Sequence, residues 1–158
     1  MTADAVVCLG IKEKVTVKVV ASHEAMLPHY ASAEAAGADL KAHTSSDITI
    51  PPKTIRLIPT GLQFEIPEGF EIQVRPRSGL ALKHGITVLN SPGTIDSDYR
   101  GEVGVIIMNH GEDVFNIQRG ERIAQMVICP VMKAEWVEVK ELPLTSRADG
   151  GFGSTGKA

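Results

Sequence analysis

The sequence is poor in cysteine, aromatic residues and positive charge, and it has no long hydrophobic run. Cys8 and Cys129 are the only cysteines, and neither belongs to a cluster with the spacing of a zinc site. An aromatic content of 4% and a net charge of -3 disfavour a protein that binds nucleic acid through base stacking and phosphate neutralisation. The apolar segment 5–11 is much shorter than the roughly 20 residues that span a membrane. We therefore expect neither nucleic acid nor a membrane as a partner.

Two isolated thiols and the lack of a secretory pattern favour a reducing compartment, and we expect a cytoplasmic protein. The length of 158 residues suits one domain with its own core. We expect a partly disordered N-terminal extension over residues 1–14, a folded domain over 15–142 and a flexible, Gly-rich C-terminal arm over 143–158. The arm has little that is apolar besides Phe152, so it cannot bury enough surface to order alone.

Alternation of apolar and polar residues, the pattern of a half-buried strand, dominates the chain. It is clearest over residues 15–19 and 70–75, where Val, Ile or Phe occupies every second position. Shorter candidate strands lie at residues 47–50, 54–58, 62–66, 86–89, 102–108, 114–117, 122–128 and 136–140. Turns that contain Pro or Gly separate them. Many short strands at close spacing predict an all-β fold, a jelly-roll-like barrel or sandwich.

One short helix is expected from Ser78 to Gly85, because Ser78 can cap the first turn and Gly85 can close the last. The Ala-rich segment 32–42 is interrupted by Gly37 and has no apolar stripe, so we expect a loop that runs into a strand. With Arg77 before it, the start of the helix is a candidate phosphate site, since free N–H groups, a hydroxyl and a guanidinium meet there. A plain helix cap with a solvated arginine is the alternative.

Three polar residues outside this helix are candidates for chemistry. Asp96 can act as a general base toward water, although Asp-Ser-Asp is also ordinary turn chemistry. Asp39 can supply oxygens to a hard cation such as Mg²⁺ through water, or be a satisfied turn or edge carboxylate. Gln125 shares a face with Ile123 and Val127, so it is either a buried amide with backbone partners or a donor to a ligand.

The C-terminal arm has donors that suit a phosphate chain. A GxGxxG pattern covers residues 151–156, but the strand before it and the helix after it that a dinucleotide site needs are missing. Ser154 and Thr155 can still donate to phosphate oxygens, Arg147 can add charge, and Phe152 can stack on a base. The segment is therefore either a lid or a frayed terminus.

Five segments, taken in order, resemble the five motifs of the homotrimeric dUTPase family. They are AGADL at 36–40, RPRSGLALKHG at 75–85, GTIDSDYRGE at 93–102, RGERIAQMV at 119–127 and RADGGFGSTG at 147–156. The resemblance implies a jelly-roll homotrimer with active sites shared between subunits. It also implies Mg²⁺-dependent hydrolysis of dUTP to dUMP and pyrophosphate by attack of water at the α-phosphorus. Such a reaction keeps uracil out of DNA and supplies dUMP for thymidylate synthesis.

The resemblance also implies a role for each matching residue. Asp96 would activate the water, and Asp39 would contact the waters of the metal. Tyr99 would stack under the deoxyribose and block a ribose hydroxyl. The uracil would be read by the hairpin residues Asn90, Gly93, Thr94 and Ile95. The phosphates would be held by Arg77, Ser78, Gly79 and Gln125. From the arm, Arg147 would clamp the γ-phosphate and Phe152 would cover the uracil, and the triphosphate would be wrapped by Gly153, Ser154 and Thr155.

Two alternatives share parts of this pattern. A dCTP deaminase-like relative has the same fold and a related nucleotide, but the GTIDSDY segment resembles the dUTPase version. A non-catalytic nucleotide-binding trimer would bind dUTP without turnover, which the presence of both Asp96 and Tyr99 disfavours.

Overall fold

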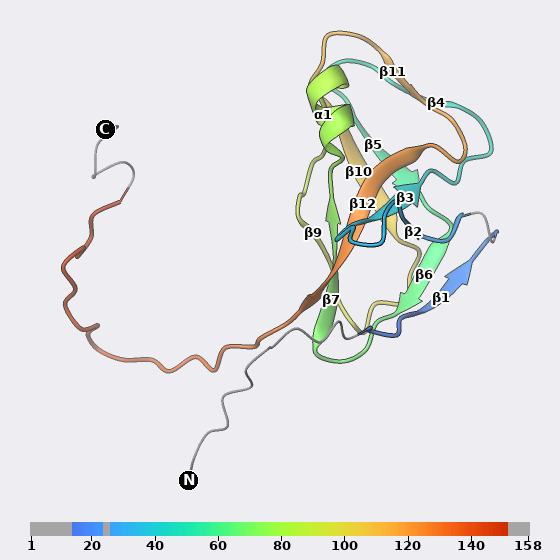
Figure 1. Cartoon of the computed structure of the whole chain (residues 1–158). Helices are drawn as coiled ribbons and strands as arrows, with labels where there is room; N and C mark the ends of the chain where they lie inside the picture. Colours follow the sequence, from blue (N-terminus) through green and yellow to red (C-terminus); the bar gives the residue numbers. More distant parts are fainter. Residues whose placement is uncertain (1–13, 24–25, 152–158) are drawn as a thin grey trace.

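The computed structural model describes residues 14–23 and 26–151 and folds them into short strands and one helix (Figure 1). The helix is α1 (Ser78–His84). The strands are β1 (Lys18–Ala21), β2 (His29–Tyr30), β3 (Ala38–Lys41), β4 (Ile48–Ile50), β5 (Ile55–Pro59), β6 (Leu62–Glu65), β7 (Phe70–Arg75), β8 (Ile86–Val88), β9 (Gly93–Ile95), β10 (Gly104–Asn109), β11 (Phe115–Ile117) and β12 (Arg122–Pro130).

All strand pairs are antiparallel, and the largest sheet has the order β2-β3-β12-β7-β9. A second sheet has the order β5-β10-β8, and two further pairs join β1 to β6 and β11 to β4. Fully buried Leu40, Ile72, Ile58 and Ile107 come from both main sheets and form the centre of one core. The expected all-β jelly roll is confirmed.

The alternation in β7 shows why these segments form strands. Ile72 and Val74 are buried in the core, whereas Glu71, Gln73 and Arg75 lie on the outer face of the sheet. Gln73 donates to Oε1 of Glu71 at 2.7 Å and accepts from Nη2 of Arg75 at 2.6 Å. The outer face therefore carries a connected row of polar side chains that leads toward α1.

Helix α1 begins and ends where the sequence predicts, but its cap differs. Arg77 occupies the N-cap position with an extended backbone, and no side chain caps the helix. Ser78 is already the first helical residue, so the expected cap by its hydroxyl is wrong. Gly85 ends the helix as predicted, with a φ of 66° and its N–H directed at the carbonyls of Ala81 and Leu80.

The expected strand at residues 136–140 is not formed. Residues 131–149 are exposed and form no strand, with a turn at residues 146–149, and Figure 1 shows this segment leading away from the domain. A strand needs a neighbour to pair its backbone groups, and the described part of the chain offers none at that place. The other expected strands form with ends shifted by at most three residues, while β2 and β9 were not predicted. No helix among the described residues is long and apolar enough to cross a membrane.

Candidate active site

Asp39, on β3, holds Arg77, which directly precedes α1, and Arg122, the first residue of β12. Its Oδ1 lies 3.1 Å from Nε of Arg77, and its Oδ2 accepts a hydrogen bond from Nη1 of Arg122 at 3.0 Å. Arg77 also donates through Nη1 to the carbonyl oxygen of Arg122 at 3.0 Å. Because Asp39 is buried and both guanidinium groups are partly exposed, the carboxylate fixes two positive groups at the protein surface. Two fixed guanidinium groups are suited to oxyanions such as phosphate.

A β-bulge in β12 explains why Arg122 takes part. Arg122 pairs with Lys41 and Ala124 pairs with Leu40, so Ile123 is an extra residue in β12. Ile123 and Ala124 are both buried, and Arg122 lies on the same face as Asp39. Strict alternation predicted that Gln125 shares a face with Ile123, and the bulge makes this prediction wrong. Sequence reasoning missed Arg122 for the same reason, because a bulge leaves no mark in an apolar and polar pattern.

Gln125 lies in the same row of the sheet, paired with Asp39 on one side and Arg75 on the other. Its Nε2 donates to the carbonyl oxygen of Pro76 at 2.9 Å, so the amide has a backbone partner. A β-carbon at Gly37 would lie 3.1 Å from Cδ of Gln125, so the glycine leaves the space that the amide occupies. Gln125 thereby fixes the loop that carries Arg77.

Ser78 and Gly79 are exposed at the start of α1, directly after Arg77. Nothing lies within 4 Å of a β-carbon built at Gly79, so the backbone there is open to a ligand. We call the set of Asp39, Arg77, Ser78, Gly79, Arg122 and Gln125 the phosphate cluster.

The other predicted residues lie in the connection from β8 through β9 to β10. Asn90, Thr94 and Asp96 are exposed, whereas Gly93 is buried against Val74 of β7. A β-carbon at Gly93 would lie 3.2 Å from Nδ2 of Asn90. The glycine therefore leaves room for the Asn90 amide to fold back over the strand.

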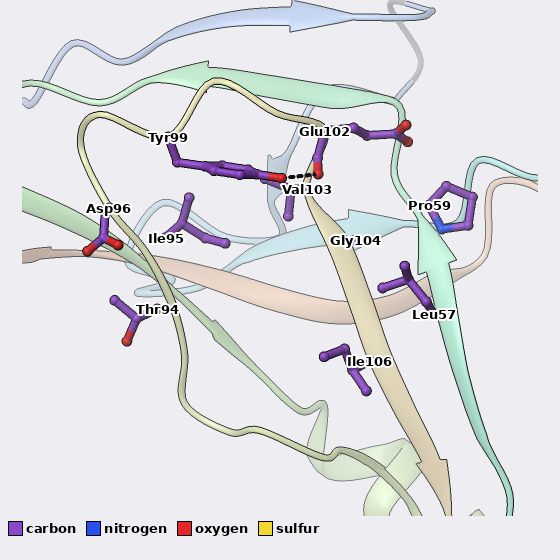
Figure 2. Close-up of a pocket in the computed structure, with 10 residues that line it drawn as sticks. All are labelled: Leu57, Pro59, Thr94, Ile95, Asp96, Tyr99, Glu102, Val103, Gly104 and Ile106. Atoms are coloured by element: carbon purple, nitrogen blue, oxygen red, sulfur yellow. Dashed lines mark hydrogen bonds between the residues drawn. The ribbon is translucent and has the colours of Figure 1, made fainter.

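Beside β9 lies a pocket of about 550 Å³, which we call the hairpin pocket (Figure 2). Figure 2 shows Thr94, Ile95 and Asp96 along one side, Leu57 and Pro59 on the side of β5, and the ring of Tyr99 reaching toward Glu102. The remaining lining residues are Val103, Gly104 and Ile106. Mostly apolar walls with a carboxylate and a hydroxyl at one side suit a flat ring that bears polar groups.

The phosphate cluster and the hairpin pocket lie far apart within one chain. Asp39, Gln125 and Arg75 form one row across the sheet, whereas Ile95 pairs with Ile72, so Asp96 lies beside Glu71 in a different row. Three strand spacings of about 4.8 Å and four residues of about 3.3 Å place the Cα atoms of Asp39 and Asp96 roughly 20 Å apart. One chain therefore does not bring the predicted residues to a single point.

The residues around Asp39 could hold a metal only together with the phosphate oxygens of a bound ligand. Within residues 14–23 and 26–151 no three His, Cys, Asp or Glu side chains are grouped so as to hold a metal ion. Magnesium is usually held by one or two carboxylates together with phosphate oxygens and waters. Each Asp39 oxygen meets one guanidinium, which leaves lone pairs that can accept hydrogen bonds from metal-bound waters.

The predicted residues of the arm are only partly described. Arg147 lies in the exposed segment after β12, where its Nε donates to the carbonyl oxygen of Gly150 at 2.8 Å. Phe152, Gly153, Ser154 and Thr155 lie outside the described residues, as do residues 1–13 of the expected N-terminal extension.

Comparisons with known proteins support the interpretation of the five sequence motifs. The family model described as dUTPase matches residues 23–156. The chain is 60% identical over 136 residues to the deoxyuridine 5'-triphosphate nucleotidohydrolase of Nautilia profundicola, which covers 86% of this chain and 94% of that protein. It is 62% identical over 132 residues to the enzyme of the same name from Rhizobium etli, covering 82% and 85%. The fold is similar to Staphylococcus bacteriophage 80alpha dUTPase with dUPNHPP, with a TM-score of 0.80, 27% identity and coverage of 89% and 98%.

Proposed function

The chain belongs to the dUTPase family, and from this premise we propose that it hydrolyses dUTP to dUMP and pyrophosphate by attack of water at the α-phosphorus. The observation that carries this proposal is the pair of complementary half-sites. One presents two fixed guanidinium groups for a phosphate chain. The other is a pocket for a flat ring, with the carboxylate of Asp96 at its side.

The hairpin pocket would read the base through backbone groups. β9 is the edge strand of its sheet and pairs only with β7 among the described strands, so backbone N–H and C=O groups on its other edge are available to a ligand. Together with the Asn90 amide they would match the uracil edge. Cytosine would leave a donor or acceptor buried and unpaired, at a cost of about 1 to 3 kcal/mol per group. Thymine would be excluded by lack of room for its methyl group.

The phosphate cluster would hold the triphosphate. Because the chain has a net charge of -3, attraction to a polyanion must be local, and Arg77 and Arg122 supply it together with Ser78 and the backbone at Gly79. Asp39 would accept hydrogen bonds from the waters of a magnesium ion carried by the phosphates. When bound, that ion would offset negative charge on the phosphate oxygens and polarise them.

Asp96 would be the general base. Its exposed carboxylate borders the pocket on the side where the phosphates of a bound nucleotide would be attached. Asp96 can therefore orient a water and accept its proton. Phosphoryl transfer needs little covalent help from a protein, since positioning and charge stabilisation provide most of the rate. Tyr99 would form the surface on which the deoxyribose rests.

The separation of the half-sites supports a homotrimer with shared sites. A distance of roughly 20 Å between the Cα atoms of Asp39 and Asp96 is too long for both clusters of one chain to contact the same phosphate. Different copies would therefore supply the phosphate cluster and the hairpin pocket of each site. The segment 131–149 supports this assembly, since Trp136 is 91% exposed and Val137 is 74% exposed in the single chain. Contiguous exposed apolar side chains mark a contact surface.

Pyrophosphate release from each deoxynucleoside triphosphate, with and without Mg²⁺, tests the proposal. We expect release from dUTP alone, and only with the metal. Ammonia from dCTP would identify a deaminase, and dUTP binding without turnover would identify a non-catalytic binder. Asp96→Asn should keep dUTP binding and lower turnover about 100-fold to 10,000-fold, the usual contribution of a general base. Asp98→Asn, in the same turn, is the matched control.

A further inference from the structure

The outer end of the Tyr99 ring, which bears the hydroxyl, is held by the loop that follows it. Its hydroxyl donates to the carbonyl oxygen of Glu102 at 3.0 Å, as Figure 2 shows. Along its outer half the ring lies against Gly101, where an added β-carbon would be 2.6 Å from Cζ of Tyr99 and 3.0 Å from Cε2. Contacts of 2.6 Å do not occur at real β-carbons, so the ring can keep this position only while residue 101 has no side chain.

The backbone of Gly101 does not itself demand glycine. Among the described glycines, positive φ angles occur at Gly61, Gly69, Gly85 and Gly120, and Gly101 is not one of them. An alanine would therefore be compatible with the backbone conformation, and the atom that must move is the far end of the Tyr99 side chain. Tyr99 is 44% exposed, so its ring has space to move.

The Glu102 carbonyl accepts the hydrogen bond of the Tyr99 hydroxyl. The β5–β6 turn fixes Glu102 itself. Its Oε1 accepts a hydrogen bond from the backbone N–H of Gly61 at 2.8 Å. On the next residue, the Val103 carbonyl accepts from the buried Thr60 hydroxyl at 2.6 Å, and the Val103 N–H donates to the carbonyl of Leu62 at 2.8 Å. The position of the ring is thus set by the β5–β6 turn as well as by its own loop.

We propose that Gly101 is a specificity-determining position and that Glu102 is a positioning residue, both acting through Tyr99 to exclude ribonucleotides. The inference rests on the proposed function, in which the sugar lies on the Tyr99 ring. A ring held at one height leaves no space for a 2'-hydroxyl beneath the sugar. A ring pushed away by a methyl group at residue 101, or released by loss of the Glu102 tether, opens that space.

The test compares kcat/KM for dUTP and for UTP in the full-length protein. Gly101→Ala should lower the ratio of dUTP to UTP efficiency by at least about tenfold, within the range by which a pocket discriminates a single small group. Tyr99→Phe removes the hydrogen bond to the Glu102 carbonyl and leaves Gly101 in place. It should lower the ratio less than Gly101→Ala does. Glu102→Ala should lower the ratio more than Glu102→Gln, which keeps an oxygen that accepts from Gly61. Glu112→Gln, at an exposed loop position remote from the pocket, is the control and should leave the ratio unchanged.

The ratio separates specificity from general damage. A purely structural role would reduce the efficiency for both substrates equally, so an unchanged ratio in Gly101→Ala, with dUTP turnover intact or reduced, would overturn the inference. If Gly101→Ala does not fold, Tyr99→Phe and Glu102→Ala still decide it by the same ratio. A wild-type protein that does not hydrolyse dUTP would instead refute the proposed function.

Discussion

Oδ1 of Asp39 lies 3.1 Å from Nε of Arg77, so a buried carboxylate on β3 fixes the residue that precedes α1. The other oxygen holds Arg122, on β12. One acidic group thus connects the two positive groups of the phosphate cluster. Asp39 thereby keeps the two guanidinium groups close together, although their like charges repel each other.

Asp39→Asn is expected to destabilise the protein by about 1 to 3 kcal/mol, because two guanidinium groups lose their charged partner. The loss should be smaller than for a fully buried pair, since the side chains of Arg77 and Arg122 are 27% and 52% exposed. Urea denaturation at fixed protein concentration measures it. Asp98→Asn, which removes an exposed carboxylate, should change stability by less than about 0.5 kcal/mol. Equal stability of the two variants would show that the Asp39 pairs contribute nothing.

The ion pair between Lys18 of β1 and Glu65 of β6 should depend on pH. Nζ of Lys18 lies 2.9 Å from Oε1 of Glu65, and this hydrogen bond lowers the pKa of Glu65 below its usual 4.5. A lowered pKa means that the bridge stabilises the folded state above pH 4.5 and that this contribution is lost as the pH falls through the lowered value. An NMR titration of the Glu65 carboxyl checks this. The pKa should return toward 4.5 in Lys18→Met, whereas the same pKa in both proteins would contradict the assignment.

Local features of the site could be predicted from the sequence because they depend on short-range chemistry. Arg77, Ser78 and the start of α1 are adjacent in the chain, and Gly85 ends the helix through its own backbone freedom. The buried face of β7 follows from its alternation. Only the apolar positions of this alternation, Ile72 and Val74, lie in the core.

What could not be predicted depends on register and on other copies of the chain. The bulge that brings Arg122 to Asp39 is set by how β12 pairs with β3, which no local pattern encodes. The separation of Asp96 from Asp39 follows from sheet order in the same way. Residues 136–140 have the alternation of a strand, yet no strand of the described chain is positioned to pair with them.

Deletion of residues 147–158 is expected to leave the domain intact and to abolish most turnover. Residues 131–149 are exposed, and Arg147 bonds to Gly150, which is deleted with it, so the core loses no described contact. If the arm closes over the triphosphate, its loss should lower kcat/KM at least about 100-fold, since charge-stabilising donors are removed. The unfolding midpoint should stay unchanged, and Arg147→Ala should show part of the kinetic loss. A truncated protein with normal activity would reject the lid.

Mixed assemblies test whether two chains build each site. Asp96→Asn and Arg77→Gln should each be inactive alone, but equal co-expression should restore roughly a quarter of the sites, because one chain can supply Arg77 and its neighbour Asp96. The matched control mixes wild type with the double variant that carries both substitutions in one chain. Shared sites again leave roughly a quarter of the sites intact, whereas sites built within one chain would leave about half in this control and none in the first mixture. The two mixtures therefore have equal activity only if the phosphate cluster and the hairpin pocket of each site come from different copies.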